Sequence, residues 1–113
     1  MNIILFHSLN HNYKKINGPP CLYPYNKDKT VLEKQIIELN KAFKNPKIHI
    51  LSNCKSKKIK NIIDNYKNIT IFDFNPEVND LHNLSNILLE INDKCLIICG
   101  NIIFGHKIFK SLD

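Results

Sequence analysis

Residues 30–51 read TVLEKQIIELNKAFKNPKIHIL and determine the fold class, because they join a helix to a strand through a short connection. Thr30 and Glu33 form the Thr-x-x-Glu pattern of a capping box, which marks the start of a helix. One side of that helix is expected to carry Val31, Leu32, Gln35, Ile36, Leu39 and Phe43. Pro46 ends the helix, and the apolar run KIHIL at 47–51 is typical of a buried strand.

The same alternation of strand and helix extends along the whole chain. Strands are expected at 2–6, 47–51, 69–74 and 94–99, and helices at 30–43, 55–66, 79–91 and from about Gly105. Short connections between alternating elements favour parallel strands with right-handed crossovers. We therefore expect an α/β fold in one domain over residues 1–113. It would be a three-layer α/β/α Rossmann-like domain with a mainly parallel four-stranded sheet.

The charge of +6 comes entirely from lysine, since all sixteen basic residues are Lys and none is Arg. Lysine, asparagine and isoleucine are all encoded by A/T-rich codons, so codon bias explains this balance more simply than a polyanionic partner does. The densest run, KSKKIK at 55–60, is typical of a solvated helix face. We do not expect a nucleic-acid partner.

Hydropathy and cysteine usage indicate a cytoplasmic protein. No apolar run approaches the length of about 18 residues that a transmembrane helix needs, and the start lacks the pattern of a signal peptide. The four cysteines form no Cys-x-x-Cys pair and do not have the spacing of zinc ligands; they are Cys21, Cys54, Cys95 and Cys99. We expect reduced thiols, with Cys95 and Cys99 in a buried strand.

Five segments together resemble a known enzyme family. They are NIILF at 2–6, PCLYP at 20–24, KTVLEKQIIEL at 29–39, NDLHNLSNILLEI at 79–91 and CLIICGNIIF at 95–104. Their order resembles the amino-terminal half of the nucleotidyltransferases that load sugar phosphates, choline phosphate or the molybdenum cofactor onto a nucleotide. The resemblance implies the strand order 3-2-1-4, whereas the order 2-1-3-4 would indicate an unrelated flavodoxin-like module.

The resemblance also implies a nucleotide site, and the chain departs from the family at that site. The family has a loop with glycines and an arginine after the first strand, and Ser8, Asn10 and Asn12 stand near those positions. Pro20 replaces the family's lysine, and Asn101 replaces an aspartate that binds the metal. A neutral amide is a poorer ligand for Mg²⁺ than a carboxylate is. The nucleotide-binding candidates are Ser8, Asn10, Asn12, Lys14, Lys15, Tyr23 and Asn101.

These departures predict an impaired active site, because nucleotidyl transfer depends on neutralising phosphate charge. No catalytic residue can be named, and Mg²⁺ would be required only by an active form. We expect a non-catalytic binding or assembly protein. The alternative is a nucleotide-binding nucleotidyltransferase of the sugar or choline phosphate type that completes its site with another chain.

The fourth strand leads to an expectation about partners. In the family, further strands pair beyond this strand, and here the resemblance covers only the amino-terminal half. An unpaired apolar edge is prone to association. We therefore expect the edge at 94–99 to be covered by the last helix, by a second copy in a homodimer, or by a partner chain.

Several side chains could add chemistry near the carboxyl ends of the strands. A metal site is conceivable at one edge, and the alternative is that its members are ordinary loop and core side chains. Its members would be His7, His11, Cys99, Asn101 and His106. Tyr23 and Tyr25 could stack on a base or pack on the sheet edge. Asp73, Glu77 and Asp80 are expected to cap or to lie in a solvated loop rather than to act as acid and base.

Overall fold

The computed structural model describes residues 1–7, 20–52, 57–72, 75, 77–100 and 102–112. The strands are β1 (Asn2–His7), β2 (Lys47–Ser52), β3 (Ile69–Phe72) and β4 (Cys95–Cys99). The α-helices are α1 (Val31–Ala42), α2 (Lys57–Ile63) and α3 (Asp80–Ile91). Two 3₁₀ helices complete the described elements, η2 (Pro20–Leu22) and η3 (His106–Leu112).

The four strands form one parallel sheet in the order β3-β2-β1-β4. In this register Ile4 of β1 lies between His49 of β2 and Ile97 of β4. The predicted order 3-2-1-4 is therefore confirmed, and it is not the flavodoxin-like order 2-1-3-4. The carboxyl ends of all four strands point to the same edge of the sheet.

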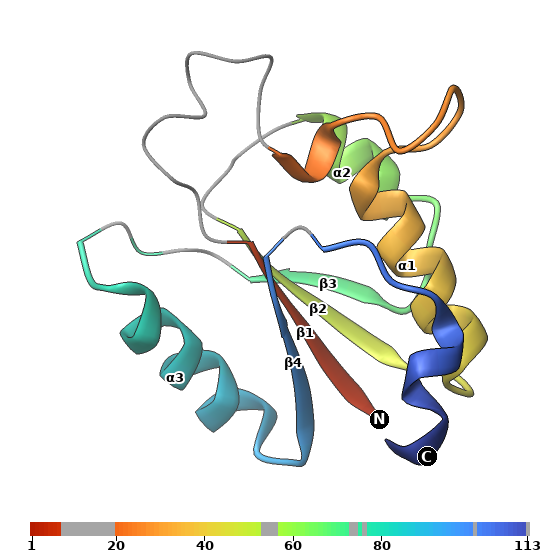
Figure 1. The fold of residues 1–113 in the computed structure, drawn as a ribbon. Helices are drawn as coiled ribbons and strands as arrows, with labels where there is room; N and C mark the ends of the chain where they lie inside the picture. Colours follow the sequence, from red (N-terminus) through yellow and green to blue (C-terminus); the bar gives the residue numbers. More distant parts are fainter. Residues whose placement is uncertain (8–19, 53–56, 73–74, 76, 101, 113) are drawn as a thin grey trace.

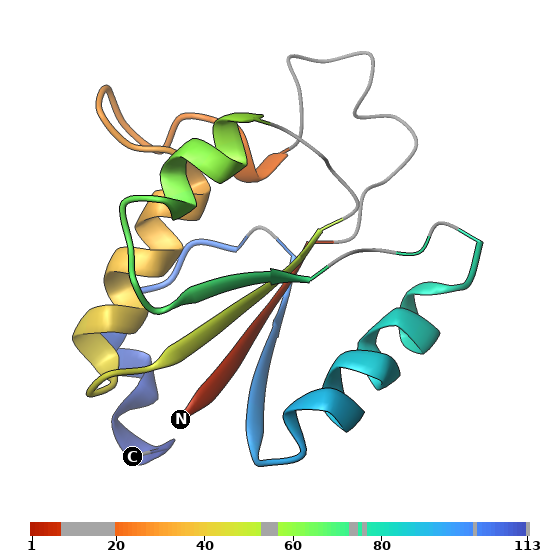
Figure 2. The same ribbon diagram turned by 180° about the vertical axis from the view of Figure 1, so that it is seen from behind.

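Helices cover both faces of the sheet and give three layers (Figures 1 and 2). α1, α2 and η3 lie on one face, and α3 lies alone on the other. The larger core lies under α1 and includes Leu5, Ile36 and Ile50, all fully buried. The smaller core joins Ile4, Phe6 and Leu51 of the sheet to Ile87 of α3. Because a single helix covers this second face, part of it stays exposed.

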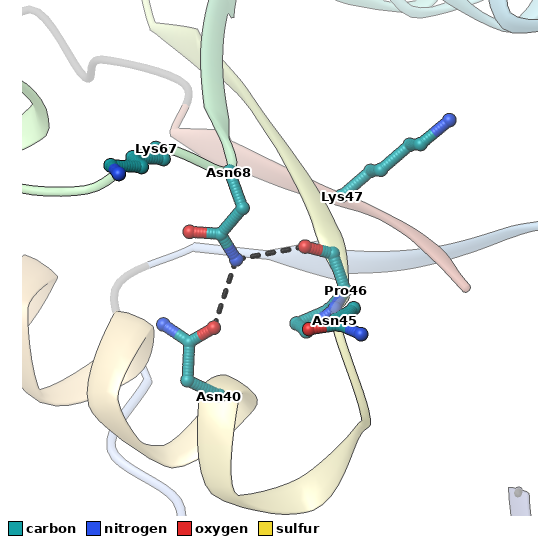
Figure 3. Close-up of a pocket in the computed structure, with 6 residues that line it drawn as sticks. All are labelled: Asn40, Asn45, Pro46, Lys47, Lys67 and Asn68. Carbon is teal, nitrogen blue, oxygen red and sulfur yellow. Dashed lines mark hydrogen bonds between the residues drawn. The ribbon is translucent and has the colours of Figure 1, made fainter.

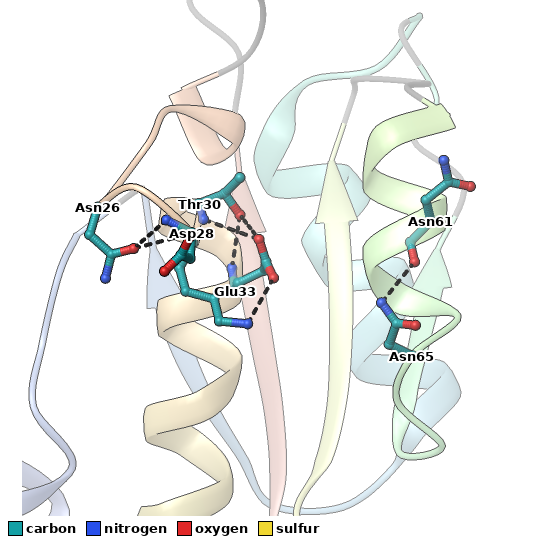
Figure 4. Close-up of polar contacts among 7 residues, drawn as sticks. Asn26, Asp28, Thr30, Glu33, Asn61 and Asn65 are labelled. Atoms are coloured by element: carbon teal, nitrogen blue, oxygen red, sulfur yellow. Dashed lines mark hydrogen bonds and ion pairs between the residues drawn. The ribbon is translucent and has the colours of Figure 1, made fainter.

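α1 begins where the capping box predicts. The Thr30 hydroxyl accepts a hydrogen bond from the Glu33 N–H at 3.2 Å, and Glu33 Oε1 accepts one from the Thr30 N–H at 3.1 Å (Figure 4). Just before it, the Asn26 side-chain oxygen accepts bonds from the N–H groups of Asp28 and Lys29, both at 2.9 Å. These local bonds satisfy backbone donors that a helix start leaves unpaired.

α3 is bounded by two asparagines with different roles. The Asn79 side chain accepts a hydrogen bond from the His82 N–H at 2.7 Å and caps the start of the helix. At the other end Asn92 takes the left-handed conformation with φ of 49°. Asparagine reaches this conformation more readily than most residues, so Asn92 ends the helix without a glycine.

The last helix is a 3₁₀ helix, and it packs on α1. The ring of Phe109 lies 5.5 Å from that of Phe43 and 5.3 Å from that of Phe104, measured between centroids. His106 Nδ1 lies 3.3 Å from Glu38 Oε2, and Lys34 donates to Glu38 Oε1 at 3.1 Å. The hydrogen bond from Lys34 lowers the pKa of the Glu38 carboxyl, which keeps it charged in this cluster. The last helix therefore covers α1 rather than the outer edge of β4.

Two expectations about the strands are wrong in detail. β1 extends to His7, which the sequence pattern assigns to the following loop, because His7 continues the pairing with β2 opposite Ser52. β4 is not a buried strand, since Cys99 is exposed and Ile97 is 36% exposed. Of its two cysteines, Cys95 is only half-buried, and Cys54 lies outside the described residues. Within the described ranges, every helix is too short or too polar to cross a bilayer.

Candidate functional site

The carboxyl ends of the strands are the place where open parallel sheets bind ligands. Most of the predicted site residues cannot be placed there, because they lie outside the described residues. These are Ser8, Asn10, His11, Asn12, Lys14, Lys15 and Asn101. The described part of this edge includes His7 at the end of β1, Gln35 on α1, and the segment that leaves β4 at Gly100.

A buried glutamine connects these three parts. The Gln35 side chain is 1% exposed, and its Oε1 lies 3.0 Å from Nε2 of His7, which is itself 2% exposed. Its Nε2 donates to the carbonyl oxygens of Ile102 at 3.0 Å and Gly100 at 3.3 Å. α1 thereby holds both the end of β1 and the segment after β4 through one side chain.

The hydrogen bonds of Gln35 also assign the protonation of His7. Both carbonyl oxygens need a donor, so the amide nitrogen must face them and Oε1 must accept from His7. His7 therefore carries its proton on Nε2, and Nδ1 is a buried acceptor without a partner among the described residues. Burial lowers the pKa of the His7 imidazole, and the bond to Gln35 opposes this only in part. Both observations indicate a neutral ring.

Gly100 makes the turn out of β4. Its φ is +85°, a conformation that disfavours residues with a side chain, and its N–H donates to the Phe6 carbonyl at 2.8 Å. Its own carbonyl and that of Ile102 are the two that Gln35 binds. Asn101 thus lies in sequence between two residues whose carbonyls are held by one side chain.

A second buried amide performs the same task on the other face of the sheet. Asn83 of α3 is 4% exposed, and its Oδ1 accepts from the Asn75 N–H at 2.8 Å. Its Nδ2 donates to the carbonyls of Asn75 at 3.0 Å and Asn79 at 3.1 Å. The segment after β3 is therefore held by α3 in the way that the segment after β4 is held by α1.

The pattern of apolar residues gave no role to either amide. Gln35 occupies one position of the expected helix stripe, and Asn83 lies within NDLHNLSNILLEI at 79–91. The available signal was a polar side chain at a helix position that faces the core, since a buried amide must find hydrogen-bond partners.

The predicted metal group is not assembled by the residues that can be placed. His7 points to Gln35 on the α1 face, whereas Cys99 pairs in register with Phe6 and lies on the α3 face. His106 instead contacts Glu38. Among the described residues, no three histidine, cysteine or acidic side chains are grouped as metal ligands. His7, Cys99 and His106 therefore do not form a metal group by themselves, while His11 and Asn101 lie outside the described residues, so the full group stays a prediction.

The two tyrosines lie at the start of α1. Tyr23 is half-buried, and its carbonyl accepts a hydrogen bond from the Val31 N–H at 2.9 Å. Tyr25 is 44% exposed, and the ammonium of Lys34 lies 5.2 Å from its ring centroid. One face of Tyr25 is thus already occupied by a cation of the same chain.

A polar hollow at the opposite edge of the sheet is held together by amides rather than by charges. It is lined by Asn40, Asn45, Pro46, Lys47, Lys67 and Asn68. Asn68 donates to Asn40 Oδ1 and to the Pro46 carbonyl, both at 2.8 Å, and both lysine side chains extend away from it (Figure 3). These bonds connect the end of α1 to the starts of β2 and β3, so we assign the hollow a structural role.

The outer edge of β4 is one of the two edges of the described sheet, and the outer edge of β3 is the other. The Gly100 N–H faces β1, and successive residues of a strand direct their N–H groups to opposite sides. The N–H and C=O groups of Cys95, Ile97 and Cys99 therefore face away from β1. No strand of the described residues pairs with them.

Comparisons with protein-family models, with curated proteins and with solved structures each found no match to the chain.

The buried histidines predict how stability depends on pH. Burial lowers the pKa of His7, and burial together with Lys47 lowers that of His49, so both are neutral in the folded state. Below pH about 6.5 the unfolded chain binds protons that the folded chain does not, so stability falls as pH falls, by up to about 1.4 kcal/mol per pH unit for His7. The urea midpoint of unfolding should decrease as the pH is lowered from 7.5 to 5.5. Above pH 7.5 these two groups should add no further change.

A histidine variant separates this effect from general acid sensitivity. His7→Leu should reduce the dependence between pH 7.5 and 5.5, whereas the matched variant His82→Leu on the exposed side of α3 should retain it. An unchanged slope in His7→Leu would contradict the assignment of a neutral buried ring.

Proposed function

We propose that this chain is a self-assembling, non-catalytic protein built on a nucleotidyltransferase-like α/β domain. The observation that carries the proposal is the free apolar edge of β4. Ile97 is 36% exposed there, Cys99 is exposed, and the outward backbone groups have no strand partner among the described residues. Such an edge is a ready template for pairing with another chain.

Among the described residues, β4 itself has none of the usual features that prevent association. Natural proteins protect free edges with proline, with charged residues, with a bulge or with a covering helix. β4 reads CLIIC and contains no charge and no proline, and η3 packs on α1 instead of over the edge. Pairing with a second copy would satisfy the backbone groups and bury Ile97.

The charges support the absence of catalysis. The chain contains no arginine, and the family's lysine and metal-binding aspartate correspond to Pro20 and Asn101. Transfer of a nucleotidyl group needs cations around the phosphates, because negative charge must be stabilised in the transition state. Scattered lysines supply point charges without the bidentate geometry of arginine.

The mass in solution tests the proposal. Light scattering during size exclusion should give twice the chain mass of 13.2 kDa. Ile97→Lys should shift the chain to the monomer, because it places two ammonium groups at the interface. The control Leu89→Lys, on a residue of α3 that is 78% exposed, should stay a dimer. A monomeric wild-type chain at micromolar concentration would refute self-assembly.

A second candidate is a nucleotide-binding protein that completes its site with another chain. The observation that favours it is the pair of hydrogen bonds from Gln35 to the carbonyls of Gly100 and Ile102, because these residues flank the position at which the family binds its metal. Thermal unfolding with each of the four nucleoside triphosphates, with and without Mg²⁺, separates the candidates. A ligand at 100 times its Kd stabilises a protein by about 2.7 kcal/mol. A Mg²⁺-dependent shift with CTP or GTP would support this candidate, and the first predicts none.

A further inference from the structure

We infer that two copies of the chain pair their β4 strands antiparallel about Ile97, so that Cys95 of each copy lies opposite Cys99 of the other. The inference rests on the proposed self-assembly and specifies its geometry. A closed dimer of identical chains has two-fold symmetry and uses the same surface on both copies. Two β4 strands related by such an axis normal to the sheet run antiparallel and extend the sheet across both copies.

The sequence of β4 is complementary to itself in this register. CLIIC reads nearly the same in both directions, so pairing about Ile97 places Cys95 opposite Cys99, Leu96 opposite Ile98, and Ile97 opposite itself. Each pair brings together side chains of similar size and polarity. A strand evolved to pair with an unrelated edge would have no need for this symmetry, which is why we choose a second copy as the occupant.

The backbone supports the same register. Cys95, Ile97 and Cys99 are the residues whose N–H and C=O groups face outward, because Gly100 donates toward β1. In an antiparallel pair, residues that both face the partner exchange two hydrogen bonds and have Cα atoms about 5.5 Å apart. Pairing about Ile97 brings all three outward residues into such pairs within β4.

Neighbouring registers use the strand less well. Two residues that lie opposite each other must have their side chains on the same face of the sheet, so the two-fold axis must pass through a residue. The neighbouring registers are therefore those with the axis at Leu96 or at Ile98. An axis at Leu96 places Cys99 opposite the charged Asp93, and an axis at Ile98 places Leu96 opposite Gly100, which has no side chain to pack. Only the axis at Ile97 pairs β4 with β4 over its full length.

The surfaces beside β4 are compatible with this arrangement. Met1 and Leu112 lie with Leu96 in a shallow, mainly apolar groove at the amino end of β4, which Lys94 and Cys95 also line, and they are 47% and 48% exposed. Ile102 and Ile103 follow its carboxyl end and are 55% and 46% exposed. Antiparallel pairing brings the amino end of one copy to the carboxyl end of the other, so apolar surface meets apolar surface. The two Lys94 residues lie at opposite ends of the paired strands, about 20 Å apart at 3.3 Å per residue.

Disulfide trapping tests the register. Two variants are made, and both carry Cys54→Ser. The first also carries Cys99→Ser and keeps Cys95, and the second also carries Cys95→Ser and keeps Cys99. Cys21 is left unchanged in both, because it is buried in the core. The oxidant is diamide. Two thiols lose two protons and two electrons to its diazene, which becomes a hydrazine, and an S–S bond forms. The variants are oxidised separately, and also together after unfolding and refolding as a mixture.

The mixture should form covalent dimer and each variant alone should not. We expect at least roughly tenfold more covalent dimer in the mixture, because a disulfide needs Cα atoms about 4.4–6.8 Å apart and identical cysteines lie at opposite ends of the paired strands. As a second measurement, Ile97→Cys with Cys54, Cys95 and Cys99 all changed to Ser should link to itself without mixing.

Each outcome decides a separate point. A dimer by mass that links in the mixture and through Ile97→Cys supports the register. A dimer by mass that links in neither, or that links equally in the separate Cys95 and Cys99 variants, overturns the register and leaves self-assembly standing. A wild-type chain that is monomeric by mass overturns both.

Discussion

Replacing Leu5 by alanine should destabilise the domain by about 2–5 kcal/mol, which is the usual range when a leucine in a core is replaced by alanine and a cavity is left. Leu5 is fully buried on β1, one of the two central strands, and belongs to the core under α1. Alanine lacks the isopropyl group of leucine, and the rigid neighbours on the sheet cannot move in to fill the space. Because a domain of this size has a stability of only about 5–15 kcal/mol, the loss should lower the urea midpoint greatly.

Two further variants make this expectation testable even if Leu5→Ala does not fold. Ile3→Val, on the same face of β1, removes one methylene and should cost about 0.5–1.5 kcal/mol. Leu89→Ala removes the same atoms as Leu5→Ala from a side chain that is 78% exposed and should change stability by less than about 0.5 kcal/mol. Equal losses in Leu5→Ala and Leu89→Ala would contradict the position of the core.

Local signals explain why the helices could be predicted. Thr30 bonds to Glu33, and Asn79 bonds to His82, so both partners of each hydrogen bond lie three residues apart. A short stretch of sequence therefore contains everything that marks the start of each helix. The alternation of strand and helix then predicts parallel strands. The order of the strands, however, came from the resemblance, since local pattern does not say on which side of β1 the fourth strand lies.

The exposure of β4 could not be predicted from its composition. CLIIC is apolar throughout, and such a run is normally typical of a strand covered on both sides. Burial depends on whether a neighbouring strand and a covering helix exist, and neither is encoded in the strand. The same limit explains the last helix, where the residues that fix η3 are Glu38 on α1 and Phe43 at its C-terminal cap, far away in sequence.

The candidate site was the least predictable part, because its hydrogen bonds join distant segments. Gln35 contacts His7, 28 residues earlier, and Ile102, 67 residues later. No spacing rule connects these positions, and the candidate residues taken from the family's loop lie outside the described residues. A polar residue within an apolar helix stripe is the feature that sequence reasoning should weigh more heavily.

Gln35→Leu should destabilise the domain by about 2–4 kcal/mol although leucine is nearly as large as glutamine and more apolar. The loss arises because the substitution leaves the buried His7 Nε2–H without an acceptor, at a cost of about 1–3 kcal/mol. It also removes the donor from the carbonyls of Gly100 and Ile102, which are only partly buried and add a smaller loss. The urea midpoint measures the total. The control Asn86→Leu also replaces an amide by leucine, on the exposed side of α3, and should change stability by less than about 0.5 kcal/mol.

A double-mutant cycle distinguishes the loss of hydrogen bonds from a simple packing defect. If Gln35→Leu destabilises the domain because His7 loses its partner, the double variant His7→Leu with Gln35→Leu should lose clearly less free energy of unfolding than the two single variants lose in sum. Residues in contact couple by about 0.5–3 kcal/mol in such a cycle. Hydrogen exchange adds a local measurement. The Gly100 N–H should exchange faster in Gln35→Leu than in Asn86→Leu, because the turn after β4 loses its hold on α1. Additive losses together with unchanged exchange at Gly100 would mean that Gln35 only fills space, and the segment after β4 would then be positioned by the backbone of the sheet alone.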